Sequence, residues 1–233
     1  MFVFQQRGDF LEKYLFILRG CPFFSGMTDQ EILTILHCMD ARVRNVDRNT
    51  YIFRAGESTE TMGLVLSGSV LVIQEDLWGH RNILAKVLPG DFFGESYAAT
   101  PGSVLSVSVV TNEDSQILML NVNHLLTTCR NSCAHHNHLI RNLVSVLAGK
   151  VLQWDSKITH ISKRSTREKL LSYLSSESIR QGKLSFDIPY DRQQLADYLS
   201  VERAAMSAEL SKLKKEGILD TQKNHFVLRG IPE

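Results

Sequence analysis

The residue types best suited to metal chemistry gather in one short segment of the chain. This segment holds Cys129, Cys133, His135, His136 and His138. Cysteine and histidine are the usual zinc ligands, and Cys133 and His136 would lie one helical turn apart. Two adjacent histidines, however, point to different faces of a helix, and exposed polar residues are expected where a helix begins. We therefore predict no metal or haem site in this segment.

A second candidate site is the stretch GESYAATPGSVLSVSVV, residues Gly94–Val110, in which Glu95 is the only charged side chain. A lone carboxylate with no neighbouring base or nucleophile does not form a catalytic pair. The chain also contains no P-loop and no metal-base motif. We predict no catalytic residues and no enzyme activity. An anion bound to this stretch would find no counter-ion in it, because no basic residue is present.

The positive charge of the chain is concentrated toward the C-terminus. There are 14 Lys/Arg and 10 Asp/Glu from Lys157 onward, against 12 and 15 before it, although the whole chain has a net charge of only +1. A basic region suits a polyanion such as nucleic acid. The four cysteines contain no CxxC pair, and the apolar runs are too short for a signal peptide or a membrane span. We expect a cytoplasmic protein that does not enter a membrane.

The region Thr50–Asn121 has the pattern of β-structure. Its apolar segments, such as TMGLVLSGSVLVI, have strand length, and glycines recur at positions 56, 68, 79, 90 and 94. Strands interrupted about every 8 to 12 residues are typical of a sandwich or barrel, because each turn needs a residue that tolerates positive φ. Trp78 and Gly79 mark a turn between two of the predicted strands.

After Asn131 the period becomes that of a long helix. Apolar residues alternate at spacings of four and three over three heptads: Ile140, Val144, Leu147, Val151, Trp154, Ile158 and Ile161. Such a seam is typical of a coiled coil, and a second apolar stripe, Leu139, Leu143 and Val146, can pack on the β-domain. We predict that the seam joins two copies of the chain. A single long core helix in a monomer remains the alternative.

The C-terminal region has readable helix ends. Ser165 and Glu168 form a capping-box pattern before one helix, and Gly182 is its stop signal. Asp191 and Gln194 form a similar pair before RQQLADYL. These signals predict compact helices from residue 165 onward.

Two of these predicted helices form a helix-turn-helix pattern. Ser200 is expected to cap VERAAMSAELSKLKKE and Gly217 to end it, so that about three residues separate this helix from the preceding one. GILDTQKNHFVLRG then offers two short strands around Lys223 and Asn224. The pattern predicts a winged helix-turn-helix.

The second helix of this motif has an apolar side and a polar side. Ala205, Leu210 and Leu213, with Met206 and Ile218, are expected to be buried. The opposite side has small residues at its start, which let the helix approach base-pair edges, and Arg203 can pair with guanine. Arg192 would meet a phosphate, and lysines crowd the far end of the helix. The residues predicted to contact DNA are Arg192, Gln193, Glu202, Arg203, Ser207, Ala208, Ser211 and Lys212.

Three segments carry a resemblance that covers roughly Pro22 to Leu228: GESTETMGLVLSGSVLVI, LPGDFFGES and DRQQLADYLSVERAAMSAELSKLKKEGIL. In order and spacing the chain resembles the catabolite activator/FNR (Crp/Fnr) family of bacterial transcription regulators. The resemblance implies an α+β protein with a cyclic-nucleotide-binding-like β jelly roll, a long dimerisation helix and a winged helix-turn-helix. We expect domain limits of 1–130, 131–162 and 163–233.

The resemblance also implies the partners of the chain. It predicts a homodimer that binds double-stranded DNA at a palindromic operator, and RNA polymerase as a partner if the chain is an activator. The residues expected to form the dimer are Ile140, Val144, Leu147, Val151, Trp154 and Ile158. Arg203 and Arg192 match arginines of the family motif, whereas Ala204 and Ala208 stand where the family often has an acidic and a basic reader. The operator sequence is therefore expected to differ from that of the best-known members.

An effector pocket follows from the resemblance as well. In cyclic-nucleotide binders of the family, a Gly-Glu pair and a later arginine hold the phosphate and ribose, and here Leu105 stands at the arginine position. A buried phosphodiester would lack its charge-assisted partner, so cyclic AMP is disfavoured. The expected pocket residues are Gly94, Glu95, Ser96, Leu105, Ser106, Ile140 and Val144.

The identity of the effector stays open. An uncharged or weakly polar molecule is favoured, and a sensor domain that binds nothing is the alternative. The iron-sulfur branch of the family needs an N-terminal cysteine cluster, and only Cys21 and Cys38 lie near that end, so no iron-sulfur cluster is expected. A different class of function, a ligand-binding signalling module whose helix-turn-helix contacts protein, also remains open.

Overall fold

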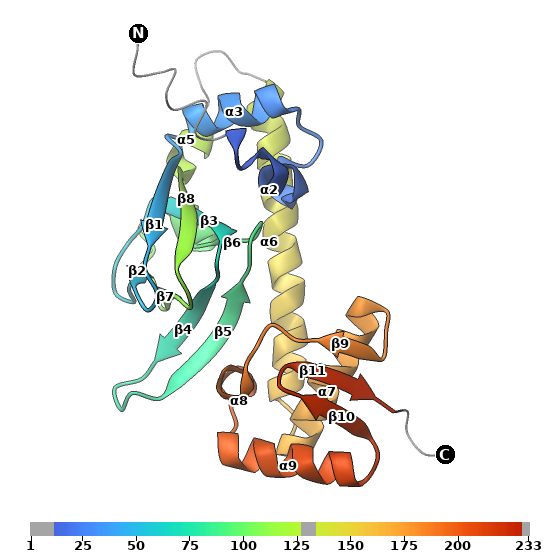
Figure 1. Cartoon of the computed structure of the whole chain (residues 1–233). Helices are drawn as coiled ribbons and strands as arrows, with labels where there is room; N and C mark the ends of the chain where they lie inside the picture. Colours follow the sequence, from blue (N-terminus) through green and yellow to red (C-terminus); the bar gives the residue numbers. More distant parts are fainter. Residues whose placement is uncertain (1–11, 127–133, 230–233) are drawn as a thin grey trace. The chain divides into compact units, whose positions relative to one another are not determined.

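Figure 1 shows the computed structural model, which describes residues 12–126 and 134–229. The described residues form two compact units. The first unit consists of residues 12–74, 85–126 and 134–150, and the second of residues 75–84 and 151–229. Each unit has its own set of fully buried side chains. Both contain helices and antiparallel strands, which confirms the α+β fold class.

The strands of the N-terminal region form two four-stranded sheets, with the orders β1-β8-β3-β6 and β2-β7-β4-β5. Eight antiparallel strands divided between two sheets are the arrangement of a jelly roll. The predicted jelly roll is therefore confirmed. The strands are β1 Arg42–Val46, β2 Tyr51–Phe53, β3 Thr61–Ser67, β4 Val70–Glu75, β5 Arg81–Val87, β6 Phe92–Phe93, β7 Ser108–Thr111 and β8 Ser115–Asn121.

Strand β1 lies outside the predicted β-region, which was expected to begin at Thr50. It forms the edge of its sheet, and β8 is its one partner among the described strands. Val46 is its one buried residue, and the sequence RVRNV therefore has no clear apolar alternation. The turn between β4 and β5 contains Trp78 and Gly79, as predicted, and Gly79 has a φ of 83°.

Short helices cover one part of the first unit. They are α2 Leu15–Gly20, the 3-10 helix η1 Pro22–Phe24, α3 Asp29–Cys38, α4 Glu95–Ala98 and α5 Val122–Leu126. Phe23 packs edge-on against Phe24 and Phe92, with ring centroids 5.0 and 4.9 Å apart. Leu139 and Leu143 join the same core, so the predicted second stripe of the long helix does pack on the β-domain.

The long helix α6 spans Ala134–Ile161, within the predicted range of 131–162. It is the extended helix that runs through the centre of Figure 1. Its first 17 residues, up to Lys150, belong to the first unit, and the remainder belongs to the second. None of the helices in the described ranges is both long and apolar enough to cross a membrane.

The second unit holds the C-terminal helices and a three-stranded sheet of order β10-β11-β9. Phe186 and Phe226 stack in its core with centroids 6.4 Å apart. The strand β9 was not predicted, since Phe186 is its only buried residue. The elements are α7 Thr166–Gln181, β9 Ser185–Asp187, α8 Arg192–Leu199, α9 Arg203–Lys215, β10 Leu219–Gln222 and β11 His225–Leu228.

The two capping boxes and the two glycine stop signals predicted in this unit are confirmed. Both capping boxes are complete: Ser165 with Glu168 begins α7, and Asp191 with Gln194 begins α8. Gly182 adopts a left-handed φ of 66° directly after α7. Gly217 has a φ of 75° and follows α9, and β10 and β11 flank the turn at Lys223 as a wing. The unit thus has the elements of a winged helix-turn-helix.

Candidate nucleic-acid interface and effector site

Three residues, 200–202, separate α8 from α9, as predicted. The expected role of Ser200 is wrong, because Ser200 does not cap α9. It adopts a left-handed φ of 52° at the end of α8, and the residue before α9 is Glu202, whose side chain makes no capping hydrogen bond. The tight turn needs a left-handed residue at this point, and the polar serine tolerates that conformation better than a β-branched residue would.

Helix α9 is buried on one side and exposed to solvent on the other. Met206, Leu210 and Leu213 are buried, as expected. Ala205 is exposed, so its predicted burial is wrong; at the 3.6-residue period it lies at the margin of the apolar side. The remaining predicted contact residues of this helix and its N-cap are all exposed: Glu202, Arg203, Ser207, Ala208, Ser211 and Lys212.

Arg203 and Arg192 differ in how their side chains are held. Arg203 makes no hydrogen bond or ion pair with any residue in the described part of the chain. Arg192 donates from Nη2 to Thr221 Oγ1 at 2.6 Å, and its guanidinium lies 4.9 Å from the centroid of the Phe226 ring. Burial lowers the pKa of Arg192 below its ordinary value. The wing therefore positions Arg192, whereas Arg203 is unrestrained.

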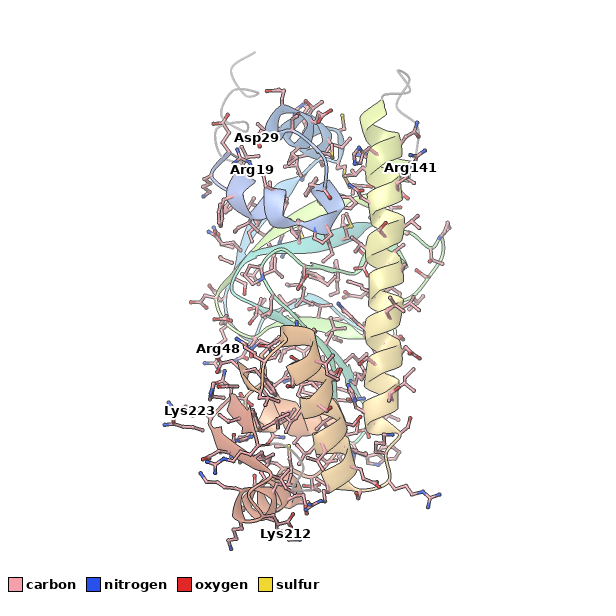
Figure 2. The ribbon with its side chains drawn as sticks, turned by 90° about the vertical axis from the view of Figure 1, so that its right-hand side faces the viewer. Arg19, Asp29, Arg48, Arg141, Lys212 and Lys223 are labelled. Carbon is pink, nitrogen blue, oxygen red and sulfur yellow. The ribbon has the colours of Figure 1, made fainter. Side chains whose placement is uncertain are left out.

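Several lysines surround the exposed side of α9. Figure 2 shows Lys212 on α9 and Lys223 on the wing, both directed away from the ribbon. Lys212 Nζ lies 3.6 Å from Glu209 Oε2, and Lys214 Nζ lies 2.6 Å from Asp220 Oδ1. Gln193 donates to Asp197 Oδ1 at 2.8 Å. These pairs lie at the surface, where an ion pair contributes little to stability and is easily exchanged for a phosphate contact.

The stretch predicted to form the effector pocket begins with a sharp turn. Gly94 has a φ of 78°, and a Cβ at this position would lie 2.6 Å from Phe53 Cε2. Both the positive φ and the close approach of Phe53 therefore require glycine. Glu95 follows at the start of α4 and is only 4% exposed. The turn thus directs a carboxylate into the interior of the first unit.

The buried carboxylate of Glu95 is paired with a cation from the long helix. Lys150 Nζ lies 2.8 Å from Glu95 Oε1 and donates to the main-chain oxygen of Phe92 at 2.6 Å. Glu95 Oε2 is buried and has no hydrogen-bond partner among the residues that the structure describes. Ser96, which is exposed, donates to Glu95 Oε1 at 3.4 Å. The turn therefore does face a positive charge, although none lies in its own sequence.

Lys150 was not predicted as a site residue, although its spacing from the core residues of α6 indicates that it faces the interior. The core stripe of α6 reads Leu139, Leu143, Val146 and then Lys150, at spacings of four, three and four. A charged residue that continues an apolar stripe faces the interior and needs a partner there. Lys157 lies seven residues after Lys150 and is buried, whereas Lys150 is only partly buried.

Leu105 is an interior residue of the same region. Its side chain is 2% exposed, and its backbone exchanges hydrogen bonds with the 56–57 segment, from Gly56 N to Leu105 O and from Leu105 N to Glu57 O, both at 2.8 Å. Ser106 is exposed, and its hydroxyl lies 2.7 Å from the Tyr97 hydroxyl. Ile140 packs against the core cluster, and Val144 is 61% exposed. The pocket roles of these residues stay predictions.

The predicted dimer seam is largely uncovered on this single chain. Val144, Val151, Trp154 and Ile158 are 61, 66, 41 and 56% exposed, while Ile140 and Leu147 are partly buried against the core of the first unit. Exposed large apolar residues in a row along a helix are typical of an interaction surface. Within the described ranges, no group of three or more metal-ligating side chains occurs; Cys129 and Cys133 lie outside these ranges.

Two family models match the chain. The cyclic nucleotide-binding domain model matches residues 43–132, and the Crp-like helix-turn-helix domain model matches residues 168–231. The two matches together cover more than half of the 233 residues. The chain belongs to the Crp/Fnr family of transcription regulators. As a Crp/Fnr regulator it combines a cyclic nucleotide-binding domain with a DNA-binding helix-turn-helix domain.

Curated Crp/Fnr relatives align over most of the chain. The Cyclic AMP receptor protein of Thermus thermophilus is 28% identical over 204 residues, which are 87% of this chain and 89% of the relative. The Transcriptional activator protein FnrL of Cereibacter sphaeroides is 21% identical over 87% of this chain and 92% of its own length. The alignments therefore include both the sensor region and the helix-turn-helix.

Solved structures share the fold. The c-di-GMP responsive global regulator CLP of Xanthomonas campestris has a TM-score of 0.70 at 20% identity, covering 88% of this chain and 100% of that one. FixK2 of Bradyrhizobium japonicum has a TM-score of 0.64 at 21% identity, covering 82% of this chain and 93% of that one. These similarities extend through both units of the Crp/Fnr chain.

Proposed function

We propose that this Crp/Fnr regulator acts as a homodimer that binds a palindromic DNA site under the control of a small effector other than cyclic AMP. Residues 1–130 would sense the effector, 131–162 would join the two copies, and 163–233 would bind DNA in the cytoplasm. The observation that carries the DNA-binding part is the exposed side of α9, on which Arg203 has no partner in the described part of the chain. A recognition helix needs such a free face, because its N-terminal residues contact base edges.

DNA binding is tested with the full chain and a labelled duplex from its own promoter region. We expect affinity to fall steeply as salt rises, because phosphate contacts release counterions. The double variant Arg192→Ala/Arg203→Ala should lose most of the specific affinity. Arg180→Ala is the matched control, since Arg180 is an exposed arginine of the same unit that pairs with Glu177 and lies outside the predicted interface. Unchanged binding by the double variant would favour a helix-turn-helix that contacts protein.

The uncovered seam of α6 supports the homodimer. Val151, Trp154 and Ile158 would meet their counterparts on a second copy, as a heptad pattern requires. Charged residues there would bury unpaired charge in the dimer, so Val151→Glu/Trp154→Glu should give a monomer in sedimentation at micromolar concentration. Leu152→Glu is the matched control, because Leu152 is 71% exposed but lies off the seam. A double variant that stays dimeric contradicts the seam.

The effector proposal rests on Leu105 and on the Glu95–Lys150 pair. A buried leucine stands where a phosphate clamp would be needed, and Lys150, the cation beside Glu95, is already bound to a carboxylate and a main-chain oxygen. We expect no heat of binding in calorimetry with cyclic AMP at millimolar concentration. Micromolar binding of cyclic AMP would overturn this part of the proposal. A mass spectrum of the native dimer purified from its host, with no retained small molecule, would favour an empty sensor domain.

A further inference from the structure

The outward side of α9 carries small side chains in its first turns and Lys215 in its last turn. By the 3.6-residue period, Ala204, Ala208 and Ser211 lie opposite the buried residues Met206, Leu210 and Leu213. All three outward residues are exposed. The part of the helix that would enter a major groove first therefore presents two methyl groups and one hydroxyl.

The hydroxyl of Ser211 is already committed as a donor. Its Oγ donates to the main-chain oxygen of Ser207 at 2.9 Å, one helical turn earlier. Ser207 itself can donate to or accept from any base, so it does not discriminate strongly. Arg203 is the one side chain at the start of α9 that could give a bidentate, base-specific pattern of donors. Lys212 is near Glu209 and lies farther along the helix.

We propose that Ala204 and Ala208 of α9 contact the 5-methyl groups of thymines that neighbour the G·C pair expected to meet Arg203, an inference that rests on the proposed function. Arginine pairs bidentately with guanine O6 and N7, and an alanine methyl contacts the thymine methyl in the major groove. The half-site is therefore a guanine next to A·T pairs whose thymine methyl groups contact the two alanines. Hydrogen bonds to their base edges contribute little.

The test begins with selection of duplexes from a randomised pool by the full-length protein. In the selected half-sites, each thymine is then replaced by deoxyuridine in both halves of the site. This removes only the methyl group and leaves base pairing intact. We expect a loss of about fourfold in affinity per contacted methyl and half-site, which is the free energy of burying one methyl group converted to a ratio.

Three alanine variants identify the side chains involved. Ala204→Gly and Ala208→Gly should each abolish the deoxyuridine effect at one thymine position. Ala205→Gly is the matched control: Ala205 is exposed and lies in the same turn but off the outward row, so the cost of glycine in the helix is the same and the deoxyuridine effect should persist.

The outcomes separate this inference from the proposed function. Failure to select any duplex would overturn DNA binding itself and this inference with it. A selected duplex whose affinity is insensitive to deoxyuridine, or equally sensitive in all three glycine variants, overturns only the methyl reading. Loss of sensitivity in Ala204→Gly and Ala208→Gly, with retention in Ala205→Gly, establishes it.

Discussion

The turn at Gly94 and Glu95, here called the sensor turn, and helix α9 place their charged groups in opposite environments. Glu95 is buried, and its Oε1 lies 2.8 Å from Lys150 Nζ, whereas Arg203 is exposed and has no partner in the described ranges of the chain. A buried charge depends on its partner for stability, while a free surface charge is available to an outside molecule. Changes at the sensor turn should therefore alter folding, and changes on α9 should alter DNA affinity.

The largest effect is expected from removing the cation that pairs with the buried carboxylate of Glu95. Lys150→Met leaves the Glu95 carboxylate inside the first unit without its cation, and Oε2 has no partner within the described residues to compensate. We expect the free energy of unfolding to fall by about 3 kcal/mol, measured by urea denaturation. Arg203→Met should change it by no more than about 0.5 kcal/mol, because that charge is exposed and unpaired.

The double variant Glu95→Gln/Lys150→Met decides whether the effect comes from charge. Gln keeps the shape of the side chain but needs no counter-ion, so most of the lost stability should return. A double variant as unstable as Lys150→Met would show that packing of the lysine stem, and not the ion pair, stabilises the turn.

A second lysine of α6 sharpens the comparison, because no carboxylate among the described residues pairs with it. Lys157 lies one heptad after Lys150, in the second unit, and is 3% exposed. Its Nζ donates to Ile83 O at 2.5 Å and lies 4.5 Å from the centroid of the Tyr198 ring. Burial lowers the pKa of Lys157 from 10.5 to about 8. The folded chain therefore releases this proton at a lower pH than the unfolded chain.

The sign of the pH effect follows from this shift. Between pH 8 and 10.5 the unfolded chain binds more protons at Lys157, so its contribution to the free energy of unfolding rises with pH, by about 3 kcal/mol over the window. Burial raises the pKa of Tyr198 to about 12, so the contribution of Tyr198 to the free energy of unfolding falls as pH rises. The difference between the wild type and Lys157→Met isolates the lysine. Lys163→Met, at an exposed position, should show no such difference.

Local signals in the sequence were enough to predict the helices and the wing of the C-terminal unit, but not its strand β9. The capping residues Ser165 and Asp191 and the glycines 182 and 217 act within one helical turn, so their roles are visible without the fold. The errors in this unit, at Ser200 and Ala205, concern residues at the edges of a turn and of an apolar face. At such positions a shift of one or two residues reverses the assignment.

The sensor site could be predicted only in part. Gly94 and Glu95 mark the turn, but the partner of Glu95 lies 55 positions later on a different element. Local patterns carry no information about which of many lysines meets a given carboxylate. Strand β1 was missed for a related reason. It has one buried residue and little apolar alternation, and it forms a strand because it pairs with β8.

A smaller effect is expected where the wing holds Arg192. Thr221 Oγ1 accepts from Arg192 Nη2 and donates to His225 O at 3.0 Å. Thr221→Val removes both bonds at nearly constant volume, which should cost about 1.5 kcal/mol of stability in urea denaturation. DNA affinity in fluorescence anisotropy should also fall, since Arg192 loses its position. Unchanged affinity would place Arg192 outside the interface. Ser185→Ala, at an exposed position in the same sheet, is the control.

The smallest effect tests whether local capping on the DNA side is coupled to binding. Asp191 Oδ1 accepts from Gln194 N at 2.8 Å, and Ser165 Oγ accepts from Glu168 N at 3.2 Å in the equivalent box of α7. Asp191→Ala and Ser165→Ala should each lower the free energy of unfolding by about 1 kcal/mol, well below the effect of Lys150→Met. Only Asp191→Ala should also weaken DNA binding in anisotropy, because Arg192 is the first residue of the helix it caps. Equal losses of affinity in both variants would mean that stability, and not the position of Arg192, limits binding.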